Sequence, residues 1–119
     1  LRAQTDLVGT LEVIRDELSR ADSGATVRVL YMSDMHESMP SRGRDFDRRP
    51  PSSTAEAEAW ADADAALLEQ MRVDPARMGR VHVRVLLGNL ANRDRAGPEI
   101  RRYWERLFQH AGIRHVEYN

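Results

Sequence analysis

The side chain best placed for chemistry is that of Asp34, which follows Ser33 at the end of an apolar run. The run, residues 27–35, is rich in β-branched and aliphatic residues and is interrupted early only by Arg28, which predicts a strand buried on both faces. In an open parallel α/β sheet, ligands bind in the crevice outside the carboxyl ends of the strands. Asp34 is therefore the first candidate for contact with a ligand or a metal ion.

A helix over residues 5–21 is predicted ahead of this strand, which we expect over residues 26–32. Apolar residues recur at helical spacing, and Thr5 or Asp6 can cap the amino end of the helix. The apolar stripe comprises Leu7, Leu11, Ile14 and Leu18. Beyond the strand, residues 35–53 have no period and carry three prolines and four arginines, so we expect a long loop that is functional or mobile.

The second half of the chain repeats the alternation of helix and strand. Ser53 and Glu56 form a capping-box pattern at the start of one helix, and Pro98 suits the first turn of another, which Gly112 closes. The predicted elements are a helix to about residue 72, a strand over 81–87, a polar loop over 89–97, a helix over 98–111 and a strand over 113–118.

Helices that alternate with strands imply parallel pairing through right-handed crossovers. We therefore predict a single α/β domain over residues 1–119, a three-layer sandwich with a mostly parallel sheet and the order α-β-α-β-α-β. Three strands are few for a doubly wound sheet, and no strand precedes the first helix, so we expect half of such a fold, without its amino-terminal strands. The unpaired sheet edge then favours association with another chain or with a second copy.

Composition narrows the classes of function. The 119 residues include 18 basic and 19 acidic side chains, and the net charge of −1 gives no support for a nucleic-acid or membrane surface. Cys is absent, which excludes disulfides, thiolate metal sites and Cys nucleophiles. No apolar run approaches the roughly 20 residues of a membrane span, and no signal peptide is visible. We therefore expect a cytoplasmic protein.

The remaining polar side chains have structural explanations. Four arginines between residues 42 and 49 are interleaved with Asp45 and Asp47, which indicates a self-neutralising loop. His82, His110 and His115 are expected to face solvent. Neither a Gly-rich phosphate loop nor an arrangement of nucleophile and base is present, so we expect that the chain is not an enzyme.

Three segments resemble the von Willebrand factor type A (VWA) family. Residues 5–11, with Thr5 at the start, are similar to the family's second metal-binding segment, in which a Thr opens a helix. Residues 30–34 resemble the strand that ends in Ser-Asp and supplies the third segment. Residues 101–113 are similar to the last helix and strand in a bacterial branch of the family; the residues that carry this likeness are Arg101, Tyr103, Trp104, Leu107, Phe108, Ala111, Gly112 and Ile113.

The resemblance implies a protein–protein interaction domain with a metal-ion-dependent adhesion site (MIDAS) for Mg²⁺ or Mn²⁺. Thr5 is then a direct or water-bridged ligand, Asp34 binds largely through water, and a carboxylate of the partner protein completes the octahedral sphere. The family's D-x-S-x-S segment is absent from the sequence. The resemblance therefore implies metal binding only where that segment is supplied.

Two alternatives stay open. Asp34-x-His36, followed by Gly88-Asn89, is similar to motifs of calcineurin-like metal-dependent phosphoesterases. In that family a His follows the Gly-Asn pair, where this chain has Leu90, and a G-D-x-x-D motif supplies further metal ligands that are absent here. The other alternative is a structural half-domain that completes its sheet by pairing with another chain.

Overall fold

The computed structural model describes residues 4–86 and 97–118, in which three strands form one parallel sheet. The strands are β1 (Val27–Met32), β4 (Val81–Leu86) and β5 (His115–Tyr118), and their spatial order is β1-β4-β5. The register places Arg28 beside His82, and His82 beside His115. The predicted α/β class, with alternating elements and parallel pairing, is confirmed.

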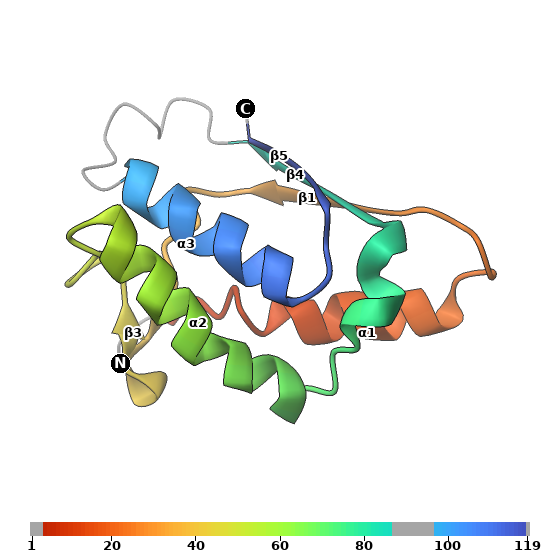
Figure 1. The fold of residues 1–119 in the computed structure, drawn as a ribbon, viewed down its shortest axis with the longest axis horizontal. Helices are drawn as coiled ribbons and strands as arrows, with labels where there is room; N and C mark the ends of the chain where they lie inside the picture. Colours follow the sequence, from red (N-terminus) through yellow and green to blue (C-terminus); the bar gives the residue numbers. More distant parts are fainter. Residues whose placement is uncertain (1–3, 87–96, 119) are drawn as a thin grey trace.

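The helices in the described part of the chain lie on one side of this sheet (Figure 1). They are α1 (Thr10–Arg20), α2 (Thr54–Gln70) and α3 (Gly97–His110), and a 3₁₀ helix, η2 (Pro75–Arg80), leads into β4. Helix α2 packs along α3, and α3 lies beneath the strands. Of the two helical layers of a sandwich, the described residues thus supply one.

Strand β1 is buried on one face only, so the prediction that both faces are buried was wrong. Its side chains alternate: Tyr31 is buried, whereas Arg28, Leu30 and Met32 are exposed. The physical reason is the placement of the helices, because none of the described helices lies over the second face. The apolar character of the run could not show which side was covered.

The core lies between the sheet and the helices, and aromatic side chains of α3 form its centre. Trp104 and Phe108 are fully buried, and the Phe108 ring lies 6.1 Å from that of Tyr31 on β1. The indole nitrogen of Trp104 donates a 2.8 Å hydrogen bond to the carbonyl oxygen of Met35. This bond attaches the segment after β1 to α3.

Residues 35–53, which we call the hairpin segment, are folded, so the prediction of a long structureless loop was wrong. They contain a two-stranded hairpin, β2 (Ser38–Met39) and β3 (Arg44–Asp45), around a short 3₁₀ helix, η1 (Pro40–Arg42). Met35 and Phe46 are buried in the main core, where the Phe46 ring lies 5.0 Å from that of Tyr103. These long-range contacts replace the local period that the segment lacks.

The predicted end signals of α2 and α3 are confirmed. The Ser53 hydroxyl accepts a 3.1 Å hydrogen bond from the backbone N–H of Glu56, and the Glu56 carboxylate accepts one of 3.0 Å from the N–H of Ser52. Gly112, after α3, has a φ of +86°, and a Cβ there would collide with the carbonyl group of Pro75. Local chemistry therefore fixes the start of α2 and the end of α3.

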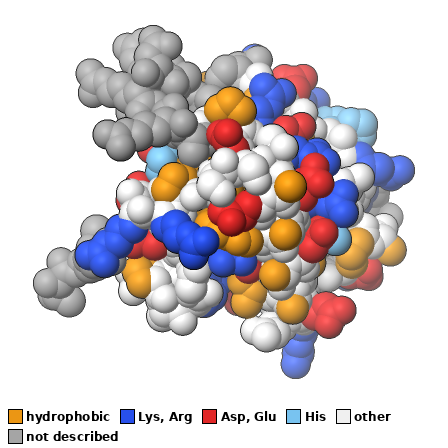
Figure 2. Space-filling model, turned by 60° about the vertical axis from the view of Figure 1, so that its left-hand side comes forward, with side chains coloured by type: hydrophobic (Ala, Val, Ile, Leu, Met, Phe, Trp, Pro, Cys, Tyr) orange, Lys and Arg blue, Asp and Glu red, His pale blue; other side chains and the backbone are white. Residues whose placement is uncertain are grey.

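The surface seen in Figure 2 carries basic and acidic side chains intermixed, with hydrophobic side chains scattered between them. Several charged side chains form ion pairs between elements, such as Arg106 with Asp62 at 2.8 Å and Arg102 with Glu58 at 2.6 Å. In the described part of the chain, no helix has both the length and the apolar character to cross a membrane.

Candidate functional site

Thr5 lies outside the helix that it was expected to open. Helix α1 begins at Thr10, and the backbone of Thr5 instead pairs with that of Ser38 through two hydrogen bonds of 2.9 Å. The turn before α1 is capped by Asp6, whose carboxylate accepts a 2.7 Å hydrogen bond from the N–H of Gly9. Asp6 therefore caps this preceding turn, whereas α1 itself has Gly9 at its N-cap position and no side-chain cap, so the predicted helix cap is not formed by Thr5 or Asp6. Thr5 instead extends the small hairpin.

Asp34 lies directly after β1, as predicted, and its carboxylate shapes a turn. One carboxylate oxygen accepts a 3.1 Å hydrogen bond from the backbone N–H of His36, and the Ser33 hydroxyl accepts one of 2.9 Å from the N–H of Met35. Met35 has a φ of +63°, which the turn requires. These contacts explain a Ser-Asp pair at this position without a ligand.

The fold brings the segments of Thr5 and Asp34 to the same region of the molecule. Thr5 pairs with Ser38, which is four residues after Asp34 at the carboxyl end of β1. Among the residues that the structure describes, no group of three or more His, Asp or Glu side chains is arranged to hold a metal ion. Metal binding by Thr5 and Asp34 stays a prediction.

His36, the residue that suggested a phosphoesterase, lies 3.1 Å from the carboxylate of Asp47 on the hairpin segment. Its expected companions, Gly88 and Asn89, lie outside the described residues. The predicted polar loop over 89–97 also lies almost entirely outside them. The phosphoesterase motif as a whole therefore stays untested.

Glu37 is a buried carboxylate that the sequence analysis missed. Only 1% of the residue is exposed, and its carboxylate accepts hydrogen bonds from the backbone N–H groups of Leu7, at 2.5 Å, and of Val8. Arg42 lies 3.6 Å from it. Burial raises the pKa of Glu37 to about 7, against the opposing effect of these hydrogen bonds and of Arg42. Glu37 thus fastens the hairpin segment to the start of α1, and no local sequence pattern marks it.

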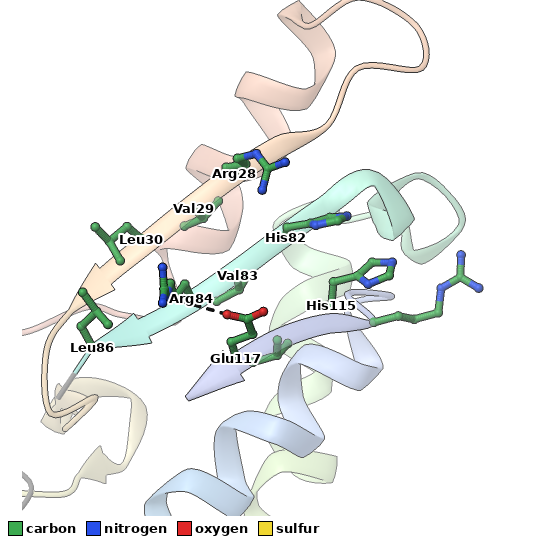
Figure 3. A pocket seen from close by; sticks show the side chains of 11 residues that line it. Arg28, Val29, Leu30, His82, Val83, Arg84, Leu86, His115 and Glu117 are labelled. Carbon is green, nitrogen blue, oxygen red and sulfur yellow. Dashed lines mark ion pairs between the residues drawn. The ribbon is translucent and has the colours of Figure 1, made fainter. Parts of the chain in front are cut away.

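One feature of the described residues without a structural explanation is the face of the sheet that the described helices leave uncovered, which we call the open face. It is formed by the outward side chains of all three strands, which line a hollow (Figure 3). Leu30 and Met32 on β1 are 54% and 77% exposed, and Leu86 lies beside Met32 in the register. These three side chains form an apolar half at the carboxyl ends of the strands.

The amino-terminal half of the open face is basic. Arg28, His82 and His115 stand in one row across β1, β4 and β5, and the two imidazole rings are stacked with their centroids 4.2 Å apart. Figure 3 shows this row at one end of the strands and Leu30 and Leu86 at the other. Between the two halves, Arg84 forms an ion pair of 3.7 Å with Glu117.

Comparison of the chain with protein-family models, with curated proteins and with solved structures finds no match to any of them. The likeness to VWA domains therefore still depends on the short motifs described above. The geometry makes the open face the stronger candidate site. One sequence signal could have indicated it: Arg28, the second residue of an apolar strand, is expected to face solvent.

Proposed function

We propose that the chain is a protein-interaction domain that binds a helix of another polypeptide on its open face. The observation that carries the proposal is the exposure of Leu30 and Met32 on β1, with Leu86 beside Met32 in the register, on a sheet whose other face is covered by helices. Parallel sheets occur almost only with both faces covered, because their strands are too apolar to remain in water. A contiguous exposed apolar patch is the usual mark of a binding surface.

A helix from a different chain fits this face better than a second copy of the same face. Helices are the elements that normally cover parallel sheets. The hollow is lined by three arginines, Arg28, Arg84 and Arg114, and by one acidic residue, Glu117. Two copies packed face to face would therefore bring an excess of positive charge together, which opposes association.

The test is a selection from a library of displayed amphipathic helices of about 18 residues, roughly 27 Å long, which is enough to span the strands. We expect the wild-type chain to enrich helices with a Leu- or Met-rich stripe. Leu30→Asp and Met32→Asp should abolish the enrichment. Val13→Asp is the matched control, because Val13 is 60% exposed on α1, which lies on the covered side of the sheet.

Enrichment that survives Leu30→Asp would place the binding surface elsewhere and overturn the proposal. Sedimentation supplies the second arm. A wild-type dimer that becomes a monomer on Leu30→Asp, and not on Val13→Asp, would mean that a second copy covers the face. Either result, surviving enrichment or a dimer through this face, would contradict the proposal that the open face binds a helix of another polypeptide.

A metal-assisted contact at the carboxyl end of β1 is the second candidate, and the pairing of Thr5 with Ser38 beside the Asp34 turn favours it. In this proposal Mg²⁺ or Mn²⁺ is held by Thr5 and Asp34 once a D-x-S-x-S segment and a partner carboxylate are supplied. Calorimetric titration with Mn²⁺, in the presence of a D-x-S-x-S peptide, should give heat that Asp34→Ala and Thr5→Ala each reduce. Equal heats for the wild type and both variants would remove this site.

The proposal also includes a cytoplasmic location, which the absence of Cys supports, and no catalytic activity. Hydrolysis of a generic phosphodiester with Mn²⁺, lost on His36→Ala, would instead favour the phosphoesterase alternative. In the same assay, Asp47→Asn should then also lower the rate of hydrolysis, because the Asp47 carboxylate lies 3.1 Å from the His36 ring.

A further inference from the structure

The basic row on the open face, formed by Arg28, His82 and His115, has hydrogen-bond donors without acceptors among the described residues. Within the described part of the chain, Arg28 forms no ion pair, and neither His82 nor His115 accepts or donates a hydrogen bond. Arg84, by contrast, is neutralised by Glu117. Elsewhere among the described residues most arginines form ion pairs, as Arg44 does with Asp64 at 2.8 Å. The row therefore offers hydrogen-bond donors and positive charge to a group from outside.

We propose that this row, Arg28 with His82 and His115, binds carboxylate side chains of the partner helix. The inference depends on the proposed function, because it names the partner that the open face recognises: an amphipathic helix with an apolar end and an acidic end. The apolar end packs on Leu30 and Met32. The acidic end receives hydrogen bonds from the Arg28 guanidinium, whose fork matches a carboxylate.

A carboxylate fits the row better than a metal ion. Two neighbouring imidazoles can bind a transition metal, but the adjacent guanidinium of Arg28 repels a cation. Arg114, which lines the same hollow, adds a second positive charge. The described residues also place no carboxylate in this row to complete a metal site, since Glu117 lies in the next row and pairs with Arg84.

The register fixes the spacing that the partner must have. Arg28 and Met32 are four residues apart on one strand, which is about 13 Å at 3.3 Å per residue. A helix rises 1.5 Å per residue, so a helix lying along the strands covers this distance in about nine residues. Acidic residues should therefore follow or precede the apolar cluster by two to three helical turns, about 7 to 11 residues, on the same face.

The experiment compares three synthetic helical peptides that share one apolar half. Their other half carries Glu, Gln or Lys at the positions predicted to reach the row. We expect the Glu peptide to bind the wild-type chain about twofold to fivefold more tightly than the Gln peptide at low salt, as exposed charge pairs do. Raising the salt concentration should reduce the difference.

Charge reversal supplies the decisive variant. Arg28→Glu should reverse the preference, so that the Lys peptide binds more tightly than the Glu peptide. Arg48→Glu is the matched control: Arg48 is exposed and follows β3, which lies away from the three-stranded sheet in Figure 1. Its reversal should leave the order of the three peptides unchanged.

The outcomes separate this inference from the proposed function. If all three peptides bind equally and Leu30→Asp abolishes binding of each, the open face binds helices but the acidic partner is wrong. If none of the peptides binds, the proposed function fails, and this inference fails with it. A single-stranded oligonucleotide that competes with the Glu peptide for the wild type, and not for Arg28→Glu, would reassign the row to phosphate and overturn the inference.

Discussion

Tyr31 and its chain neighbours Leu30 and Met32 are large side chains of one strand, yet they meet opposite surroundings. Tyr31 contacts the Phe108 ring in the core and shares a 2.5 Å hydrogen bond with the Thr10 hydroxyl. Leu30 and Met32 point away from the helices and are mostly exposed. The covered face therefore holds the fold together, whereas the open face is available for binding. Substitutions on the two faces should separate stability from recognition.

The largest effect is expected from Phe108→Ala, on the covered side. Phe108 is fully buried between Tyr31 and Trp104, and removal of its ring leaves a cavity. We expect the free energy of unfolding to fall by about 3 to 5 kcal/mol, measured by chemical denaturation. A loss below about 1 kcal/mol would show that the helices do not seal this face.

A smaller effect, dependent on pH, is expected at Glu37. Burial raises the pKa of this carboxyl from 4.5 to about 7 in the folded chain. Between these pH values the folded state binds more protons than the unfolded state, so the free energy of unfolding should fall as the pH rises, by up to about 3 kcal/mol. The stabilisation that protonated Glu37 contributes is fully present below pH 4.5 and is lost as the pH rises through about 7.

Glu37→Gln should remove this part of the pH dependence, because the amide does not ionise and its oxygen can still accept from the N–H of Leu7. The measurement is a series of denaturation curves between pH 4 and pH 8, in about four steps, for the wild type and the variant. Glu12→Gln, at an exposed position on α1, is the control and should follow the wild-type curve. Parallel curves for the wild type and Glu37→Gln would contradict the prediction.

The smallest effect on stability is expected on the open face itself. Leu30→Asp and Met32→Asp should each change the free energy of unfolding by less than about 0.5 kcal/mol, because both side chains are already exposed. The same denaturation assay measures it. A loss comparable to that of Phe108→Ala would mean that the face is covered within the chain itself, which would break the contrast between the two faces.

The sequence was informative where structure follows from nearby residues. The Ser53 cap, the Gly112 end and the three apolar strands depend on local chemistry or on a regular period, and their positions were predicted to within a few residues. Helix α1 was placed five residues too early, because its stripe begins with Leu7 whereas the preceding turn is capped by Asp6.

What the sequence did not predict depends on contacts between distant segments. The burial of Glu37 depends on Leu7, which is thirty residues away in the chain and whose backbone N–H donates a hydrogen bond to the Glu37 carboxylate. Thr5 was assigned to a helix, and its actual partner is Ser38. The open face was missed because hydropathy alone cannot tell whether Leu30 or Tyr31 meets a helix. The candidate site therefore emerged from the register and the helix placement, while Asp34 alone was located correctly at the strand end.

The environments of the two tryptophans give this molecule two distinct optical signals. Trp104 is sealed in the core with its indole nitrogen bonded to Met35, so its fluorescence emission should lie at short wavelength and resist quenching by acrylamide. Trp60 is half-buried, and the guanidinium groups of Arg44 and Arg49 lie 4.6 Å and 5.4 Å from its ring centroid. It should emit at longer wavelength and be quenched by iodide, which those cations attract. Local opening of the hairpin segment can therefore be followed separately from global unfolding, without any added label.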